Sequence, residues 1–249
     1  MYVNLKKKYG QNFLIDKNIL SKISNLINLQ NKKVLEIGPG AGHLTDFILE
    51  KKPKTLILIE IDNELTKNLK LKYSKNKIVE IINIDFLKFD LMSKNKFDII
   101  ISNLPYNVAS QILVKISTSI IKPKSMILMF QKEFADKLLE TKLNSINSII
   151  RCFYDIKKRF NVKKNSFFPV PKVESTILEF LELRTPLINE LEILEFINFK
   201  REIFSKKRKT IKSILNKKYD LNLCNYNLNM RAEELSINNL IDIFRVFNS

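Results

Sequence analysis

Three glycines and one acid stand at positions that suit a nucleoside-containing ligand. Gly38, Gly40 and Gly42 interrupt the chain directly after an apolar run, and Glu60 follows the next apolar run at residues 55–59. Glycine lets the backbone approach a ligand without a Cβ atom, and the start of a following helix offers unpaired N–H groups. An acid at the tip of the neighbouring strand can accept both hydroxyls of a ribose. The spacing therefore predicts a site for a cofactor that contains a nucleoside.

Two cofactor classes fit this pattern, a dinucleotide and S-adenosyl-L-methionine. A glycine-rich turn alone is a weak signal, because many βα units carry one for packing, and the acid at the next strand end strengthens it. The order here is E-x-G-x-G-x-G with Glu36 in front, not G-x-G-x-x-G. That spacing resembles the motif of methyltransferases rather than that of dehydrogenases, so it favours the methyl donor.

Six short motifs are spread along the chain. In order they are K-K-Y-G-Q-N-F-L-I-D from Lys7, E-I-G-P-G from Glu36, Asn103-Leu104-Pro105-Tyr106, Gln131-Lys132-Glu133, Phe167 to Val173, and Arg231-Ala232-Glu233. Their sequences and order resemble those of the ribosomal RNA adenine N6-dimethyltransferases of the KsgA family, over nearly the whole chain. The resemblance implies an enzyme that uses S-adenosyl-L-methionine to dimethylate N6 of two adjacent adenines in a 3′-terminal hairpin of small-subunit (16S-type) rRNA. It also implies a role in small-subunit biogenesis.

The segment Asn103 to Tyr106 suits methylation of an exocyclic amine, whose nitrogen lone pair is delocalised into the purine ring. The side-chain carbonyl of Asn103 and the backbone carbonyl beside Pro105 can accept the two N–H protons and turn the lone pair towards the donor. Pro105 stiffens the loop, and Tyr106 offers a ring for base stacking. No general base is required, because positioning supplies much of the acceleration. The alternative is an ordinary turn, since Asn and Pro are common turn residues.

The resemblance also implies roles for individual residues. The expected cofactor-binding residues are Gln11, Asn12, Leu14, Gly38, Gly40, Glu60, Ile61, Asp85, Phe86 and Asn103, and the expected catalytic residues are Asn103, Leu104, Pro105, Tyr106 and Phe167. Asp85 would bind the adenine amino group with Phe86 beside the ring, and Phe167 would cover the other face of the target base. The alternatives are a turn acid at Asp85 and a core aromatic at Phe167.

Two other functions remain open. One is the related large-subunit rRNA adenine N6-methyltransferase of the macrolide-resistance type, which shares the Asn-x-Pro-Tyr chemistry. The second is a ribosome-assembly or binding factor built on the same fold. One departure from the family is the segment Leu143 to Asn147, which stands where the family usually carries Tyr-Gly and an apolar stretch.

Composition favours an anionic partner. The 249 residues include 43 Lys and Arg against 26 Asp and Glu, a formal charge of +17, and such charge is most often a sign of nucleic acid. An A/T-biased coding sequence would also enrich lysine. Two distant cysteines and one histidine lack metal-site spacing, so no metal is expected. Without a signal core or an apolar run of about 18 residues, the expectation is a cytoplasmic protein, and a monomer is the default.

Apolar runs alternate with amphipathic stretches as far as residue 184. Together with the resemblance, this pattern predicts an α/β, Rossmann-like methyltransferase domain at 1–184, with a seven-stranded, mostly parallel sheet and a basic N-terminal arm. Asp16 is the expected N-cap of the first helix. Beyond Arg184-Thr185-Pro186, apolar residues recur at helical spacing and predict a small all-helical RNA-binding domain at 185–249.

Two basic clusters are expected to contact RNA phosphates. Their members are Lys6, Lys7 and Lys8 in the arm, and Lys206, Lys207, Arg208 and Lys209 in the helical domain. Lys200, Arg201, Lys212, Lys217 and Lys218 extend the second cluster. The alternative is a solvated helix face.

Overall fold

The computed structural model describes residues 12–92, 97–206, 208–216, 218–221 and 224–248. The chain divides into two compact units, one comprising residues up to Ala135 together with Ile156–Glu182, and the second comprising Asp136–Asp155 together with Leu183–Ser249. This division differs from the expected boundary at 184, because 136–155 group with the C-terminal segment. In the described ranges no helix is both long and apolar enough to cross a membrane.

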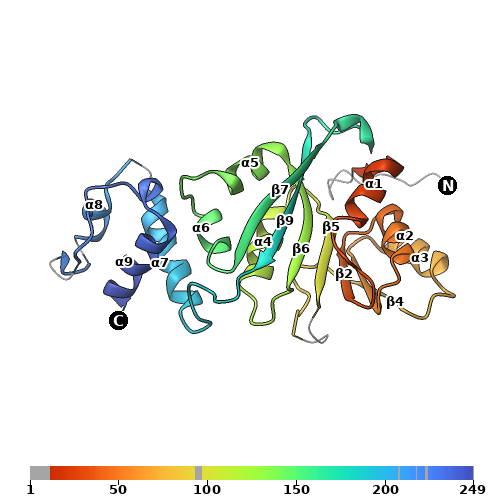
Figure 1. The fold of residues 1–249 in the computed structure, drawn as a ribbon, viewed down its shortest axis with the longest axis horizontal. Coiled ribbons are helices and arrows are strands. Elements are labelled where there is room, and N and C mark those ends of the chain that lie inside the picture. The colour runs from red at the N-terminus through yellow and green to blue at the C-terminus, as the bar shows by residue number, and fades with distance from the viewer. Residues whose placement is uncertain (1–11, 93–96, 207, 217, 222–223, 249) are drawn as a thin grey trace. The chain divides into compact units, whose positions relative to one another are not determined.

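The first unit is built on a seven-stranded sheet with the strand order β4-β3-β2-β5-β6-β9-β7 (Figure 1). The strands are β2 (Lys33–Ile37), β3 (Thr55–Glu60), β4 (Val79–Asn83), β5 (Ile99–Asn103), β6 (Ser125–Gln131), β7 (Tyr154–Val162) and β9 (Ser175–Glu182). The first five in spatial order pair in parallel, and β9 runs antiparallel to β6. This confirms the predicted Rossmann-like sheet.

The strand order reverses between β2 and β5. From β2 the chain continues through β3 to β4 at one edge, and it then returns to β5 on the other side of β2. In open α/β sheets ligands bind outside the carboxyl ends of the strands at such a point. The glycine turn, Glu60 and Asn103 all lie at these carboxyl ends.

Helices cover both faces of this sheet. They are α1 (Lys17–Ser24), α2 (His43–Glu50), α3 (Asn63–Lys72) and α4 (Ala109–Ser117), and a further helix, α5 (Lys132–Leu139), spans the division between the two units. Figure 1 shows α1, α2 and α3 on one side of the sheet and α4 on the other. Asp16 Oδ1 accepts the N–H groups of Asn18 at 3.0 Å and Ile19 at 3.3 Å, which confirms the predicted N-cap. Asp62 caps α3 in the same way.

A two-stranded sheet joins distant parts of the sequence beside the main sheet. It pairs β1 (Phe13–Leu14) with β8 (Phe167–Phe168), Phe13 opposite Phe168 and Leu14 opposite Phe167. Because successive side chains of a strand point to opposite faces, the two inward residues, Leu14 and Phe167, are buried in the core. Phe13 and Phe168 therefore share the other face.

The second unit is helical. Its elements are α6 (Asn147–Ile150), α7 (Ile193–Ser205), α8 (Ile211–Leu215), the short 3₁₀ helix η4 (Ala232–Glu234) and α9 (Ile237–Asn248). Phe196 and Phe199 of α7 contact the ring of Phe244 in α9, with centroids 5.2 and 5.6 Å apart.

Lys200 does not contribute to the expected basic surface of this unit. It is only 8% exposed, and its Nζ donates to the backbone carbonyl of Ser145 at 2.6 Å and to the Ser145 hydroxyl at 3.1 Å. Burial lowers the pKa of Lys200 to about 8. The lysine thus ties the segment that departs from the family to α7, which is one physical reason why residues 136–155 belong to this unit.

Candidate active site

The glycine turn after β2 is shaped by three left-handed backbone conformations. Gly38, Gly40 and Gly42 have φ of 64°, 59° and 77°, a region that side chains with a Cβ atom rarely adopt. A Cβ atom on Gly40 would lie 2.6 Å from Cε1 of Phe13. Glycine is therefore required here both by the backbone conformation and by the close approach of Phe13.

The N–H groups of these glycines are already engaged by the protein. Gly38 donates to the Ile59 carbonyl at 2.8 Å and Gly42 to the Pro39 carbonyl at 2.9 Å, and Gly40 donates to Glu60 Oε2 at 3.1 Å. In dinucleotide sites the pyrophosphate lies on free N–H groups at this turn. This turn offers none from its glycines, so it suits a cofactor without phosphates, such as S-adenosylmethionine.

Glu60 is held firmly at the end of β3. Its Oε1 accepts the N–H of Asp62 at 2.9 Å while Oε2 accepts that of Gly40. Burial raises the pKa of Glu60, and these two backbone hydrogen bonds oppose the shift. Each carboxylate oxygen keeps a lone pair, so the side chain can also accept ribose hydroxyls.

Glu36 is a second buried acid in the same pocket. It is 2% exposed, and its Oε2 accepts a hydrogen bond from the Thr45 hydroxyl at 2.6 Å. Burial raises the pKa of Glu36 from 4.5 to about 8, although the Thr45 hydrogen bond opposes the shift. The acid is therefore largely protonated at neutral pH in the folded chain.

This shift predicts a pH-dependent stability. Between pH 4.5 and about 8, Glu36 binds a proton when folded but has lost it when unfolded, so its contribution to the free energy of unfolding falls as pH rises. The limiting slope is about 1.4 kcal/mol per pH unit. Between pH 6 and pH 8, the free energy of unfolding measured in urea should fall less in Glu36→Gln than in the parent, because the glutamine amide does not titrate. Equal losses in variant and parent would contradict the protonated state.

The opposite side of the pocket is formed by the segment after β4. Asp85 Oδ1 accepts the N–H of Leu87 at 2.9 Å, which sets the turn, and the Phe86 ring is buried. Lys115 of α4 donates to the Leu87 carbonyl at 2.7 Å. Its ammonium also lies 5.7 Å from the Phe86 ring centroid, so α4 supports this segment.

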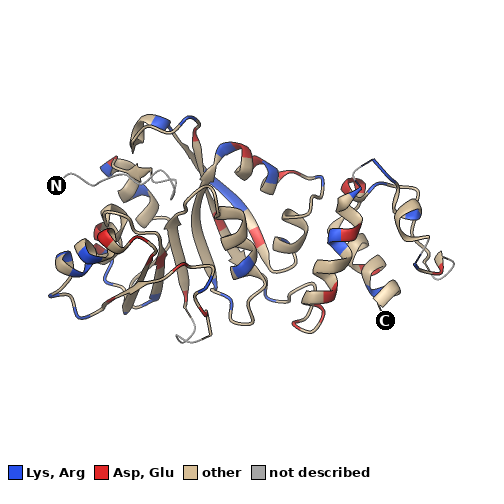
Figure 2. Ribbon diagram, turned by 180° about the vertical axis from the view of Figure 1, so that it is seen from behind, with Lys and Arg blue, Asp and Glu red and all other residues tan. Residues whose placement is uncertain are grey.

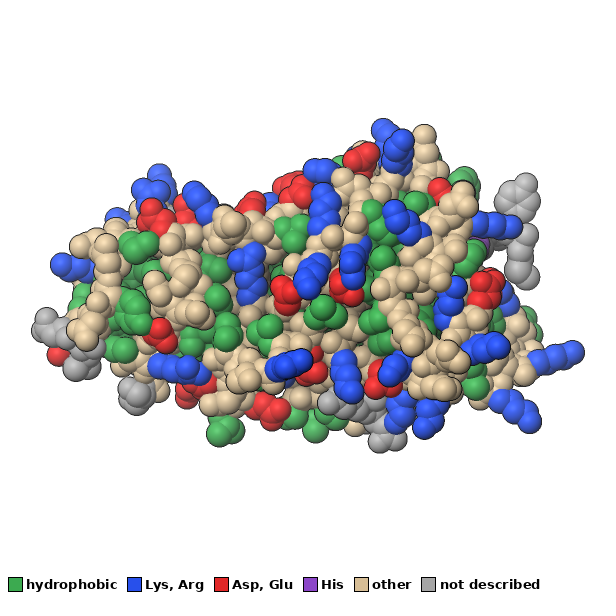
Figure 3. Space-filling model, in the orientation of Figure 1, with side chains coloured by type: hydrophobic (Ala, Val, Ile, Leu, Met, Phe, Trp, Pro, Cys, Tyr) green, Lys and Arg blue, Asp and Glu red, His purple; other side chains and the backbone are tan. Residues whose placement is uncertain are grey.

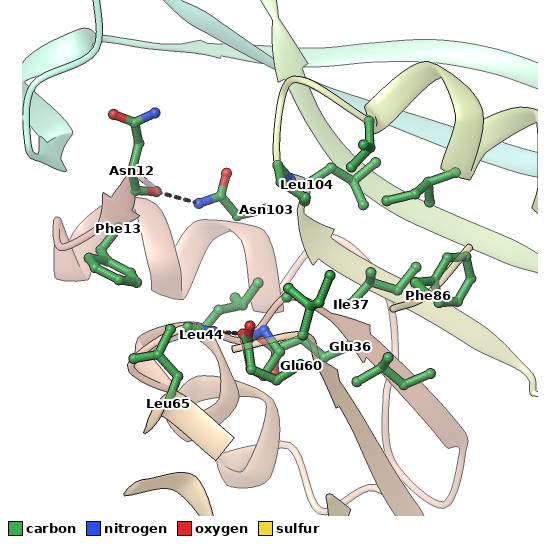
Figure 4. Close-up of a pocket in the computed structure, with 18 of the residues that line it drawn as sticks. Asn12, Phe13, Glu36, Ile37, Leu44, Glu60, Leu65, Phe86, Asn103 and Leu104 are labelled. Carbon is green, nitrogen blue, oxygen red and sulfur yellow. Dashed lines mark hydrogen bonds between the residues drawn. The ribbon is translucent and has the colours of Figure 1, made fainter. Parts of the chain in front are cut away.

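Asn103 ends β5 and is oriented by the N-terminal segment. Its Nδ2 donates to the Asn12 backbone carbonyl at 3.0 Å (Figure 4). This contact fixes the amide, and within the described residues nothing donates to its Oδ1. The Pro105 carbonyl accepts the N–H of Val108 at 3.2 Å, whereas no described N–H group donates to the Leu104 carbonyl. Within the described residues, the Asn103 Oδ1 and the Leu104 carbonyl thus both remain available as acceptors.

Tyr106 completes this loop. Its hydroxyl shares a 2.6 Å hydrogen bond with the Ser175 hydroxyl at the start of β9, and burial raises its pKa. The phenol is therefore neutral and anchored at its tip. Anchoring the tip fixes the plane of the ring on which a base can stack.

One pocket brings together every predicted cofactor and catalytic residue in the described ranges except Phe167. These residues are Asn12, Leu14, Gly38, Gly40, Glu60, Ile61, Asp85, Phe86, Asn103, Leu104, Pro105 and Tyr106. Figure 4 shows Phe13 and Phe86 on opposite sides of it. Phe167 is 1% exposed, packs in the core and does not line the pocket, because its register in β8 turns it inward.

The predicted RNA-binding residues are placed only in part. Lys6, Lys7, Lys8 and Lys207 lie outside the described residues, as does Gln11, which was predicted to bind the cofactor. Lys206, Arg208 and Lys209 are exposed and belong to the connection between α7 and α8 rather than to a helix face. Their contact with RNA stays a prediction.

Sequence reasoning missed four residues of this site. They are Phe13, which packs closely on Gly40, and His43, whose ring nitrogen lies 3.1 Å from the Leu14 carbonyl. The others are Thr45, which donates a hydrogen bond to Glu36, and Ser175, which shares one with Tyr106. His43 and Thr45 follow the glycines directly, which is a usable signal. Phe13 and Ser175 reach the site through strand pairing, for which no local signal exists.

Comparisons with known proteins identify a family and relatives that match most of this chain. A profile of the family described as ribosomal RNA adenine dimethylase matches residues 2–249. The chain is 40% identical to ribosomal RNA small subunit methyltransferase A of Pelagibacter ubique over 88% of this chain and 86% of the relative. It is 36% identical to the protein of the same name from a Sulfurihydrogenibium species, over 97% and 95%.

Solved structures extend the likeness to the fold. A dimethyladenosine transferase from Plasmodium falciparum superposes with a TM-score of 0.81 at 26% identity, covering 95% of this chain and 97% of that one. The 23S rRNA methyltransferase ErmE superposes with a TM-score of 0.73 at 22% identity, covering 95% and 100%, which shows a shared fold alone. Since the profile spans almost the whole chain, this protein belongs to the ribosomal RNA adenine dimethylase family.

Proposed function

We propose that this chain dimethylates N6 of two adjacent adenines in a 3′-terminal hairpin of small-subunit rRNA and acts in small-subunit biogenesis. The methyl donor is S-adenosylmethionine, which supplies an electrophilic methyl group when bound. The reaction is proposed to take place in the cytoplasm, on a monomer of the protein. The observation that carries the proposal is the Asn103 amide, held by Asn12 beside the pocket of Gly40 and Glu60.

The residues of the loop after β5 account for the amine chemistry. The Asn103 Oδ1 and the Leu104 carbonyl accept hydrogen bonds from the two N–H groups of the adenine amine. These two hydrogen bonds turn the nitrogen lone pair out of conjugation with the ring and point it into the pocket. Tyr106 stacks on the base. A target adenine must leave its stack to enter, and stacking of about 1–3 kcal/mol per base offsets part of that cost. The amine proton then passes to solvent.

The residues of the glycine turn fit the donor. Glu60 would accept hydrogen bonds from the ribose hydroxyls, Asp85 would accept one from the adenine amino group, and Phe86 would flank the adenine ring. The donor carries a sulfonium cation, and Glu36 lies within the same pocket. A nearby cation favours ionisation of a buried carboxyl, so cofactor binding should release a proton from Glu36.

Small-subunit rRNA is preferred over large-subunit rRNA as the substrate. Relatives at 36–40% identity carry the small-subunit name, whereas the 23S enzyme shares the fold at only 22% identity. A role purely in binding is disfavoured, because the two hydrogen-bond acceptors of the loop after β5 lie at the pocket that suits a cofactor without phosphates.

Primer extension in a bacterial strain that lacks its own small-subunit dimethylase tests this proposal. When the strain carries this chain, reverse transcription should stop at two adjacent adenines near the 3′ end of the small-subunit rRNA. The large-subunit rRNA from the same cells serves as the comparison. A stop confined to the large-subunit rRNA would replace the proposal with the resistance-type function.

A further inference from the structure

One segment of the first unit, residues 156–173, contains basic residues but no acidic ones. Between residues 156 and 173 the chain has six Lys or Arg residues and no Asp or Glu. They are Lys157, Lys158, Arg159, Lys163, Lys164 and Lys172, and all six are exposed. Arg159 forms an ion pair with Glu179 at 2.5 Å.

This segment runs from the sheet edge towards the pocket. β7 is an edge strand of the sheet. Figure 2 shows Lys and Arg residues, in blue, along this strand and in the turn that follows it. Figure 3 shows Lys and Arg side chains on the surface of the molecule in the orientation of Figure 1. The turn is fixed to the start of α1, because the Ser166 carbonyl accepts the N–H of Ile15 at 2.9 Å and of Asp16 at 3.3 Å. The Ser166 hydroxyl also donates to Asp16 at 3.1 Å. The cations therefore lead to the segment whose Phe13 lines the pocket.

An exposed aromatic ring stands at the end of this path. Phe168 is 60% exposed, although it is a large apolar residue in a paired strand. It lies opposite Phe13 on the shared face of β1 and β8, while Leu14 and Phe167 fill the core behind it. The pairing thus presents the Phe168 ring next to a pocket residue, outside the core.

Cations beside an exposed aromatic ring match the pattern of single-stranded nucleic-acid binding, in which phosphates follow the cations and bases stack on the rings. Lysines on an edge strand also discourage sheet-to-sheet association. That role explains Lys157 and Lys158 but not the turn residues Lys163 and Lys164, which lie beyond the strand. It also gives no reason for an exposed Phe168.

We propose that rRNA next to the target adenine lies along this surface, defined as Lys157, Lys158, Lys163, Lys164 and Phe168. The lysines contact phosphates of the unstacked strand, and a base next to the target adenine stacks on Phe168. This inference rests on the proposed function and adds an RNA path on the methyltransferase unit.

Two variants separate the parts of this surface. In Lys163→Gln/Lys164→Gln, the KM for small ribosomal subunits that lack adenine dimethylation should rise about 10-fold at 150 mM salt, with kcat within twofold of the parent. The slope of log KM against log salt should fall by about 0.7–0.9 per lost phosphate contact. Phe168→Ala should raise the KM about 10-fold without changing the salt slope, because stacking is not ionic, and Phe168→Tyr should restore the parent KM.

The control is Lys67→Gln/Lys70→Gln, which removes the same charge from the exposed face of α3 at the other side of the sheet. Its KM and salt slope should equal those of the parent. Parent-like values in both test variants, or an equal loss in the control, would overturn the RNA path while leaving the proposed function intact. If the parent itself transfers no methyl group, the proposed function fails. In that case, fluorescence anisotropy with a labelled adenine-containing RNA hairpin tests the surface separately. The two test variants should bind the hairpin more weakly than the parent and the control variant do.

Discussion

Asn103→Ala should lower kcat for methyl transfer to small subunits by about 100- to 1,000-fold, the range seen when one preorganised hydrogen-bonding group is removed from a transition state. The reason is that Asn103 Oδ1 is one of the two acceptors proposed to hold the amine, and Asn12 sets the orientation of its amide. Single-turnover transfer from saturating S-adenosylmethionine measures the chemical step directly.

The cofactor Kd of this variant should stay within a few-fold of the parent, because the glycine turn and Glu60 are untouched. Asn63→Ala, an exposed asparagine at the start of α3, is the matched control and should keep the parent rate. A rate within tenfold of the parent in Asn103→Ala would mean that the amine is not held by this side chain.

Glu60→Ala should raise the Kd for S-adenosylmethionine by about 10- to 100-fold. A hydrogen bond to a charged group contributes about 1.5–3 kcal/mol, and this carboxylate is buried and positioned by Gly40 and Asp62. The substitution also leaves those two N–H groups without their acceptor, so the Tm should fall by a few degrees. Isothermal titration calorimetry measures the Kd and thermal unfolding the Tm.

The matched control for this prediction is Glu50→Ala, which removes an exposed acid at the end of α2. It should leave the Kd unchanged. If Glu60→Ala binds the cofactor as tightly as the parent does, the ribose does not contact Glu60, and the assignment of the pocket would have to change.

The local parts of the site could be predicted from the sequence. The glycine turn and Glu60 are separated by one βα unit, and the parallel pairing of β2 with β3 brings their ends together. The apolar runs likewise determined the seven strands. These features depend on residue spacing within short segments, which the sequence displays directly.

The long-range contacts could not be predicted in this way. Asn12 reaches Asn103 across 91 positions and Tyr106 reaches Ser175 across 69. Phe167 and Phe168 are adjacent and chemically identical, so only the register of β8 against β1 decides which ring is buried. Because shifting a strand by one residue exchanges its faces, no local pattern could distinguish them.

Lys200 illustrates a further limit. A lysine in a dense basic run is normally exposed, and the sequence gives no sign of the Ser145 groups that bind this one. Its burial depends on how residues 136–155 fold back onto α7, which also explains why these residues group with the helical unit.

The measurement that tests the central claim most directly is the transfer of labelled methyl groups from S-adenosylmethionine to purified small ribosomal subunits that lack adenine dimethylation. Large subunits are treated in parallel, and digestion to nucleosides identifies the product. We expect N6,N6-dimethyladenosine on the small subunits only. Label confined to large subunits, or no label on either while the cofactor still binds, would contradict the account.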